Sequence, residues 1–423
     1  MKGIKKLTNI LQEFSVPLIA GVLLGLLAAN LNPKWYKEIV HFPIFGSNAV
    51  LFHHRVDLHF LINDVFMVLF FGVATKEITE SALPGGALNP IRKAINPLLG
   101  TLGGVLGPIG VYFALTYVFY GGTPLFGTVA KGWGIPTATD IALAWLIARM
   151  VFGKGHPAIN FLLLLAVADD AIGLVIIAVF YPNPSHPVTP IWLLLTAGGM
   201  GVAFALRAMK VNTWLPYIVF GGLLSWIGLL KASLHPALAL VFIVPFLPGP
   251  KQDAGLFEEE SPYEEPDSEG KNAPTNDHHE THSPLENFEH NIKLPVDLGL
   301  FFFAFANAGV AFSAINTVTW IILASLLIGK TVGVFLFSTI GVALGFPLPT
   351  GMKRRHLIVA GMIAGLGLTV ALFVAGEAFP LKNDLTASFQ GPAKMGAVLS
   401  ILAAVFAAIF GKMLRVKDGG KDA

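Results

Sequence analysis

Long apolar stretches recur from one end of the chain to the other, and short polar segments separate them. A helix needs roughly 20 mainly apolar residues to cross the hydrocarbon core of a bilayer. The pattern therefore predicts an all-α polytopic membrane protein, surrounded by lipid, with about twelve transmembrane helices. The predicted helices cover residues 14–32, 58–79, 94–119, 133–150, 158–181, 189–206, 213–230, 233–248, 295–313, 318–345, 356–377 and 394–412.

The composition supports this class of protein. Of the 423 residues, 54% are hydrophobic and only 13% are charged, whereas soluble domains carry about 25% charged residues. The net charge of +2 indicates no nucleic-acid partner, and the lack of cysteine excludes disulfides and thiolate metal sites. Because the sequence shows neither an obvious nucleophile nor a metal triad, we expect no enzyme activity and no cofactor.

Lys and Arg residues are distributed unevenly between the two sides of the predicted bundle. An even number of helices places both termini on one side. With the termini inside, 20 of the 28 basic residues lie inside and seven outside, Lys394 among the latter, while Lys330 alone lies within a helix. Basic residues favour the cytoplasmic side, which predicts cytoplasmic termini. The basic start also fits a signal peptide, but the apolar run from Phe14 to Leu31 is long enough for an uncleaved first helix.

Two connections between the helices are longer than the rest. Residues 250–292 hold 12 of the 26 acidic residues, which predicts an acidic, hydrophilic cytoplasmic loop between helices 1–8 (residues 1–249) and helices 9–12 with a cytoplasmic tail (residues 293–423). Metal binding by His278, His279 and His282 in this loop is possible, but their spacing matches no standard metal site. A polar loop rich in histidine explains them more simply. The other connection, FPIFGSNAVLFHH, predicts either a small extracytoplasmic β-hairpin around Ser47-Asn48 or an irregular loop.

A few charged residues fall in the middle of predicted helices. They are Asp140, Asp169 and Asp170, with Lys330 as the only deep base. A charge at the bilayer centre costs at least ~2.5 kcal/mol, so such residues usually face the bundle interior and mark an ion path. A buried ion pair that only orders helices is the alternative. Adjacent helix residues point about 100° apart, so Asp169 and Asp170 are expected to face different partners, unlike the converging carboxylates of an aspartic protease.

Two of the predicted helices carry signals for a break. GWGIPTATDIALA contains Pro136, which removes a backbone donor, and predicts a break near Thr137 to Thr139. AGMIAGLGLTVALFVAG is a second, glycine-rich segment in the other half of the chain. Half-helix ends carry partial charges, which Asp140 could offset at the N-termini and Lys330 at the C-termini. Interrupted helices at corresponding places indicate a transporter's binding site, although glycine can also mean only tight packing.

At these residues the chain resembles the NhaA family of sodium/proton antiporters. The similar stretches, which cover nearly the whole chain in family order, are GIPTATDIALA, AVADDAIGLVIIAVFY, FFAFANAGV, LLIGKTVGVFLF and AGLGLTVALFVA. This family is itself one of the known examples of transporters with interrupted helices at the binding site. The resemblance implies twelve helices, with inverted repeats of helices 3–5 and 10–12 whose broken helices cross at mid-membrane. It also implies the cytoplasmic (inner) membrane of a bacterium, and a homodimer joined through the outer hairpin.

The resemblance further implies a role for individual residues. Asp169 and Asp170 match the family's ion-site pair, and Thr139 and Asp140, which are further candidate ion- or proton-binding residues, match its ATD motif. Lys330 matches its intramembrane lysine, and the resemblance makes Asp169 its expected partner. A separate group is assigned to pH response. It comprises Glu289, in the stretch FEH, and Glu77, which follows a lysine, Lys76, at the position where the family usually has a glutamate. Lys293 replaces another common family residue, a histidine, and these departures bear on the pH set point.

The proposed chemistry is competition at one site. Sodium prefers oxygen ligands, which Asp170, with Asp169 and the Thr139 hydroxyl, could supply. Burial disfavours the charged form of a carboxylic acid, so such groups can hold either a proton or a cation. The resemblance implies secondary active, electrogenic sodium (or lithium)/proton antiport for pH and sodium homeostasis, with sodium leaving and protons entering. The alternatives are a related transporter of another cation or an organic anion, and a channel.

Overall fold

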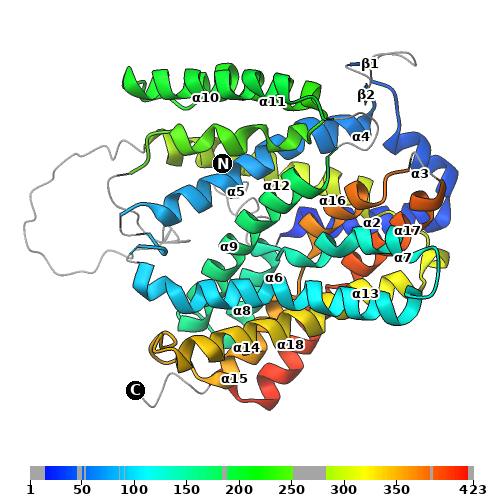
Figure 1. Ribbon diagram of the computed structural model, residues 1–423, viewed down its shortest axis with the longest axis vertical. Helices are drawn as coiled ribbons and strands as arrows, with labels where there is room; N and C mark the ends of the chain where they lie inside the picture. The colour runs from blue at the N-terminus through cyan, green and yellow to red at the C-terminus, as the bar shows by residue number, and fades with distance from the viewer. Residues whose placement is uncertain are drawn as a thin grey trace, which may run out of the picture.

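The structure is a computed structural model that describes residues 15–44, 50–51, 54–84, 86–89, 91–182, 188–250, 283–381 and 384–417. It is predominantly helical (Figure 1). The helices are α2 (Val16–Leu31), α3 (Pro33–Val40), α4 (Leu58–Phe60), η1 (Leu61–Phe66), α5 (Met67–Ala82), α6 (Ile91–Tyr120), α7 (Phe126–Val129), η2 (Ala130–Thr137), α8 (Ile141–Phe152), α9 (Pro157–Phe180), η3 (Pro190–Trp192), α10 (Leu193–Ala208), η4 (Tyr217–Gly222), α11 (Leu223–Ala232), η5 (Pro236–Phe242), η6 (Val244–Phe246), α12 (Pro284–Ala308), η7 (Phe312–Ala314), α13 (Thr317–Ala324), η8 (Ser325–Gly329), α14 (Lys330–Ala343), α15 (Arg354–Ala364), α16 (Leu368–Ala378), α17 (Asp384–Leu399) and α18 (Leu402–Met413).

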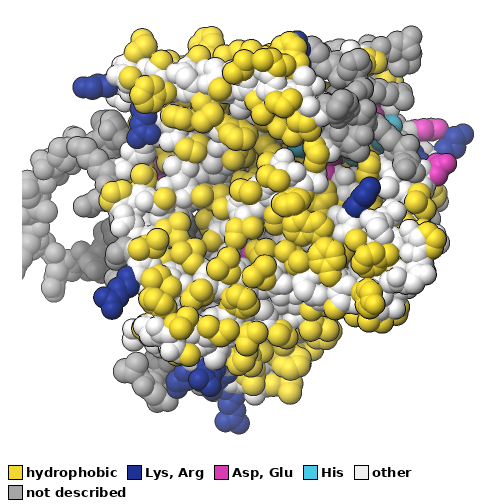
Figure 2. Space-filling view, in the orientation of Figure 1, with side chains coloured by type: hydrophobic (Ala, Val, Ile, Leu, Met, Phe, Trp, Pro, Cys, Tyr) yellow, Lys and Arg dark blue, Asp and Glu magenta, His cyan; other side chains and the backbone are white. Residues whose placement is uncertain are grey.

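Several helices have the length and apolarity needed to cross a membrane. Among the described residues six continuous helices qualify, and up to eight if each of two bent helix pairs counts as one span. The space-filling view shows a broad apolar surface, with most of the visible Lys, Arg, Asp and Glu side chains at its margins (Figure 2). The chain is therefore a multi-pass membrane protein. Each of the twelve predicted segments overlaps a helix or a broken helix pair.

The predicted acidic loop ends earlier than residue 292. Helix α12 begins at Pro284, because Ser283 forms a capping box with Glu286, each side chain bonding the other residue's backbone N–H. The prediction of a loop up to residue 292 is wrong in this last part, where the acidic composition outweighed the capping signal. Residues 251–282, including the three histidines, lie outside the described residues.

Two short strands lie in the predicted extracytoplasmic connection. Strands β1 (Val50–Leu51) and β2 (His54–Arg55) pair antiparallel, with Val50 opposite Arg55. The predicted hairpin centre, Ser47-Asn48, lies outside the described residues. The pair stands at the upper right of the molecule in Figure 1, near α3 and α4.

Glycines set the closest helix contacts. Where α6 crosses η8 and α14, Gly103 and Gly107 lie against Gly329 and Gly333, and a methyl group on any of the four would collide with the backbone of the other helix. Small residues let helix backbones approach closely, which is a main source of stability between helices in lipid. This crossing fixes α14, the helix that begins with Lys330, against α6.

Candidate functional site

The first predicted break is present. The 3₁₀ helix η2 ends at Thr137 and α8 begins at Ile141, with a bend of 55° between them. Residues Ala138 to Asp140 are not helical, which confirms the predicted break near Thr137 to Thr139. Proline has no N–H to donate to a helix, and Pro136 adopts a non-helical backbone conformation there.

The glycine-rich segment is broken as well, and the two breaks touch. Helices α15 and α16 meet at a 49° bend. Across the contact, the backbone N–H of Asp140 donates to the carbonyl of Leu366 at 2.6 Å. The hydroxyl of Thr139 lies 2.9 Å from the carbonyl of Ala364. Backbone groups that each break releases are therefore satisfied by the other broken helix, as polar groups within a membrane protein must be.

Asp140 serves two helix N-termini at once. One carboxylate oxygen accepts from the N–H of Leu143 in the first turn of α8, at 3.1 Å. The other accepts from the hydroxyl of Thr369 at 2.9 Å and lies 3.4 Å from its N–H, in the first turn of α16. Negative charge at a helix N-terminus offsets the helix dipole. The predicted position of Asp140 at half-helix N-termini is thus confirmed, on both broken helices.

Lys330 and Asp169 form a buried pair beside the crossing. The Lys330 Nζ donates to Asp169 Oδ2 at 2.5 Å, to the Thr139 hydroxyl at 2.7 Å and to the carbonyl of Thr137 at 2.8 Å. Neither side chain of the pair is exposed to solvent. The Thr137 carbonyl is the last of η2, so the ammonium faces the negative end of a half-helix. The predicted Lys330–Asp169 contact is confirmed.

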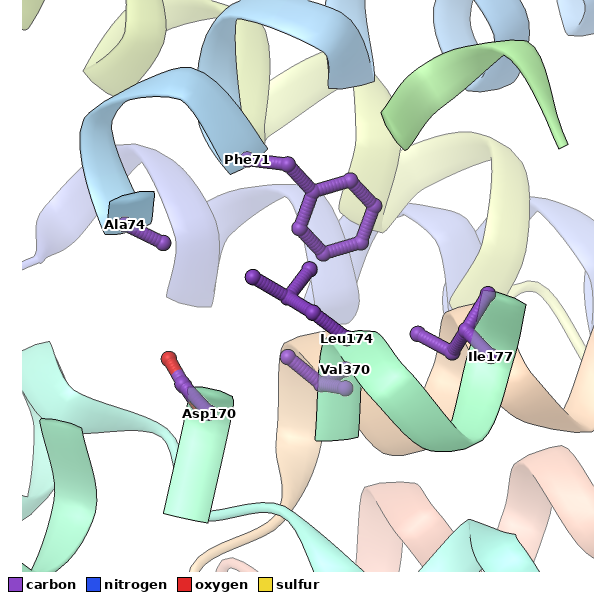
Figure 3. A pocket seen from close by; sticks show the side chains of 6 residues that line it. All are labelled: Phe71, Ala74, Asp170, Leu174, Ile177 and Val370. Carbon is purple, nitrogen blue, oxygen red and sulfur yellow. The ribbon is translucent and has the colours of Figure 1, made fainter. Parts of the chain in front are cut away.

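Asp170 faces away from this pair. Its carboxyl group points into a pocket lined by apolar side chains of α5, α9 and α16 (Figure 3). The lining residues are Phe71, Ala74, Leu174, Ile177 and Val370. One oxygen of Asp170 and one of Asp169 are buried without a hydrogen-bond partner. Two adjacent carboxylates thus each keep a free lone-pair site, which is chemistry suited to a cation.

The structure divides the predicted ion ligands into two groups. Thr139 lies with Asp169 and Lys330, while Asp170 occupies the separate apolar pocket. Among the described residues, no cluster of three or more His, Asp or Glu side chains is arranged to hold a metal ion.

One of the two predicted pH-response residues, Glu289, pairs with the lysine that precedes the other, Glu77. Lys76 Nζ donates to the carboxylates of Glu80, one turn along α5, and Glu289 on α12. Lys76 is only 5% exposed. Glu77 follows Lys76 on α5. It is three residues from the pocket residue Ala74, so the two lie on the same face of the helix. Lys76 thus forms an ion-pair bridge between α5 and α12.

A second buried polar network was missed from the sequence. His235 Nε2 lies 3.3 Å from Glu377 Oε1 and 4.0 Å from Asp64 Oδ1. Nearby, Lys394 Nζ donates to Asn307 Oδ1 at 3.1 Å. Asn307 in turn donates to Asn63 Oδ1 at 2.9 Å.

The prediction that Lys330 is the only deep base, with Lys394 outside, is wrong. Lys394 is 7% exposed within a candidate span, because α17 continues through Pro392 rather than beginning after it. A sequence signal was available in part, since the polar pair Asn63-Asp64 interrupts the apolar run of the predicted helix 58–79. In the structure this pair stands in the π-helical turn η1, and such turns recur at functional sites.

An aromatic contact joins the two regions. The Phe373 ring lies 5.2 Å from that of the pocket residue Phe71 and 4.6 Å from that of His235. Helix α16 thus begins beside Asp140, at the crossing, and ends beside His235, in the second network. The two regions share a rigid element.

Crossed broken helices with a buried Asp–Lys pair and an unpartnered carboxylate define the class of membrane proteins that transport ions. Within that class, the family model described as "Na+/H+ antiporter 1" matches residues 7–414. The chain therefore belongs to this family.

Individual relatives agree. The "Na(+)/H(+) antiporter NhaA" of Geobacter metallireducens is 54% identical over 413 residues, covering 98% of this chain and 99% of the relative. The protein of that name from Desulfitobacterium hafniense is 53% identical over 414 residues, covering 98% and 97%. The solved structure of the sodium proton antiporter MjNhaP1 from Methanocaldococcus jannaschii has a TM-score of 0.53 at 14% identity, covering 96% of this chain and 92% of that one, and supports the fold alone.

Proposed function

We propose that this chain is a secondary active antiporter that exchanges sodium, or lithium, for protons, with sodium leaving the cell and protons entering. Family membership supports the exchange of sodium for protons. The observation that carries the site assignment is the pair of unpartnered, buried oxygens on Asp169 and Asp170 beside two crossed broken helices. Moving more protons than sodium ions in each cycle would make the exchange electrogenic.

Asp170 is the main ion ligand in this proposal. It sits in an apolar pocket, where a carboxylate without a partner is costly. Either a proton or a sodium ion removes that cost, and one excludes the other. Exchange then follows from competition at the Asp169–Asp170 pair, which is exposed to each side in turn. Asp170 alone would release one proton per sodium ion, so electrogenic exchange needs a second proton from Asp169 or Lys330.

Asp169, Thr139 and Lys330 form the neighbouring unit. In one role the Lys330–Asp169 pair is structural and Thr139 orients it through bonds to both side chains. In the other role sodium draws Asp169 away, and Lys330 releases a transported proton. Asp140 holds the half-helix N-termini together in both roles, while Glu289 and Glu77 adjust the pH dependence through the Lys76 bridge.

The finer architecture belongs to the same proposal. The twelve predicted segments would all cross the membrane, with α6 to α9 as one repeat and α13 to α18 as its inverted copy. Both termini would be cytoplasmic, at the inner membrane of a bacterium. Residues 1–249 and 284–423 would form the transport unit around the acidic loop, and the β1–β2 pair would join two copies in a homodimer. The bend in each proposed repeat supports this arrangement.

Asp170→Asn tests the site. Asparagine keeps the shape of the side chain but loses its charge and its exchangeable proton, so we expect loss of exchange with normal membrane insertion. Proteoliposomes that contain the purified protein would be given a pH gradient. Sodium, lithium and potassium would then be added in turn, and the change in the pH gradient would measure exchange. Asp384→Asn, an exposed position on α17, is the matched control. Parental exchange in Asp170→Asn would refute the assignment, and a parental response to potassium alone would favour a transporter of another cation.

A further inference from the structure

Helices α9 and α15 begin side by side at one end of the molecule. Gly351, just before α15, lies next to Pro157, the first residue of α9. The end of α18 packs there as well, where Gly411 lies between Val151 and Val416. We call this region the α9–α15 surface, and define it by Lys154, His156, Lys353, Arg354, Arg355, His356 and Arg415.

The elements that build the α9–α15 surface contribute basic residues and no acidic ones. The sequence has no Asp or Glu in residues 141–168, 298–376 or 385–417. Lys154, Lys353, Arg354 and Arg415 are exposed, and Arg355 is half-buried. Figure 2 shows a group of Lys and Arg side chains at the lower edge of the molecule, near the position of α15 in Figure 1, with no Asp or Glu beside it. The surface therefore favours an anion.

Two histidines lie in the floor of this surface. The rings of His156 and His356 are 4.7 Å apart. Nδ1 of His156 accepts from the N–H of Ala158 at 3.1 Å, and Nδ1 of His356 accepts from that of Lys353 at 2.9 Å. A ring nitrogen that accepts a hydrogen bond carries no proton, so each neutral ring has its proton on Nε2.

Three N–H donors of this floor have no acceptor. They are Nε2 of His156, Nε2 of His356 and Nε of Arg355, all buried without a partner. His356 is 0% exposed. A metal ion would need a lone pair on Nε2, which this tautomer does not offer. Donors with no acceptor, surrounded by cations, instead fit the oxygens of a phosphate.

Apolar side chains beside the surface indicate where the phosphate comes from. Met150, Leu344 and Met413, at the adjoining ends of α8, α14 and α18, are 61%, 65% and 69% exposed. These helix ends belong to candidate spans or adjoin them, so they lie at the level of lipid headgroups. Basic pockets between transmembrane helices at the cytoplasmic side are suited to anionic headgroups, with acyl chains along the apolar residues.

We propose that the α9–α15 surface binds the headgroup phosphate of an anionic phospholipid. Arg354, Arg355 and Lys353 supply charge, and the two histidines supply neutral N–H donors. The lipid would hold the start of α9, which carries Asp169 and Asp170, against the start of α15, the first half of a broken helix. This site is separate from the ion site, so the proposal of lipid binding does not depend on the proposed antiport.

The test compares lipids on the purified full chain in detergent. Native mass spectrometry would measure retained lipid after addition of phosphatidylglycerol or phosphatidylcholine. We expect at least tenfold higher retention of phosphatidylglycerol, and at least a tenfold loss of this preference in Arg354→Gln/Arg355→Gln. Lys34→Gln/Lys37→Gln, on exposed α3 positions, removes the same charge and should keep the preference. His156→Asn, which retains a capping oxygen without the Nε2 donor, should lower retention severalfold.

Three outcomes would overturn the proposal. The first is equal retention of the two lipids. The second is an unchanged preference in Arg354→Gln/Arg355→Gln. The third concerns the thermal unfolding midpoint, measured with millimolar inorganic phosphate alone. If free phosphate raised this midpoint as much as phosphatidylglycerol does, the site would take a soluble ion rather than a lipid. None of these measurements uses transport, so they do not depend on the proposed exchange.

Discussion

Replacing Lys330 by Gln should destabilise the protein in a way that depends on pH. The change removes an ammonium that makes three hydrogen bonds and leaves Asp169, which is fully buried, with Thr139 as its remaining partner. Removing one member of a buried ion pair typically costs about 3–5 kcal/mol, since the other charge loses its compensation. Glutamine can keep one neutral hydrogen bond, so we expect the lower end, about 3 kcal/mol.

The sign of the pH effect follows from proton binding. In Lys330→Gln the folded protein can avoid a bare charge by holding a proton on Asp169, whereas the unfolded chain is ionised at neutral pH. The folded state then binds more protons, so stability should fall as pH rises, by up to ~1.4 kcal/mol per unit. Denaturant unfolding in detergent at pH 6 and pH 8 would measure this.

A double-mutant cycle isolates the pair. Lys330→Gln/Asp169→Asn contains no buried charge at this position, so it should recover most of the stability lost by Lys330→Gln, with a coupling of about 2 kcal/mol or more. If Lys330→Gln were as stable as its parent at both pH values, the account of the pair would be wrong. The number of protons moved per sodium ion separates the two roles, because only a proton-carrying Lys330 lowers it on replacement.

Three further outcomes are expected. Deleting residues 253–281, which spares the Ser283 cap, should leave basal exchange intact while its pH dependence moves; abolished exchange in a correctly inserted variant would show that the loop takes part in the cycle. Gly333→Ala should destabilise by about 1–3 kcal/mol through collision with the α6 backbone, while Gly110→Ala, in open space on α6, should change thermal stability little. Burial alone would raise the pKa of Asp57, but the hydrogen bonds from His41 and Phe60 lower it below 3.8. Asp57→Ala should therefore cost about 1 kcal/mol near neutral pH, and urea unfolding should show this difference vanish as pH falls through the folded pKa below 3.8.

Much of the ion site could be predicted because its residues violate the chemistry of their surroundings. An aspartate pair or a lysine within an apolar run stands out, and Pro136 identifies a break without any tertiary information. The resemblance then connected Lys330 with Asp169, which are 161 residues apart. Periodicity alone could not have joined them, since it says nothing about which helices are neighbours.

The second network could not be found in the same way. His235 and Asn307 are ordinary in sequence, and Glu377 falls near a predicted helix end where a charge needs no explanation. Lys394 is the first residue of the last predicted helix, 394–412, where a basic residue at the outer end needs no explanation. Only the packing of α5, α12, α16 and α17 brings these side chains together. The start of α12 was missed because twelve acidic residues dominated the composition around a single capping box.

The glycine crossing of α6 with α14 has a mechanical consequence. Backbone lies against backbone there, with no side chains between them to change rotamer when one helix slides or turns. The two helices therefore move as one rigid unit, and this unit includes Lys330, which follows Gly329 in the chain. A change in the distance between the Lys330 and Asp169 side chains therefore requires α9 and the broken helices to move relative to α6 and α14. A covalent link between α6 and α14 should leave exchange running, whereas a link between α14 and α9 should arrest it.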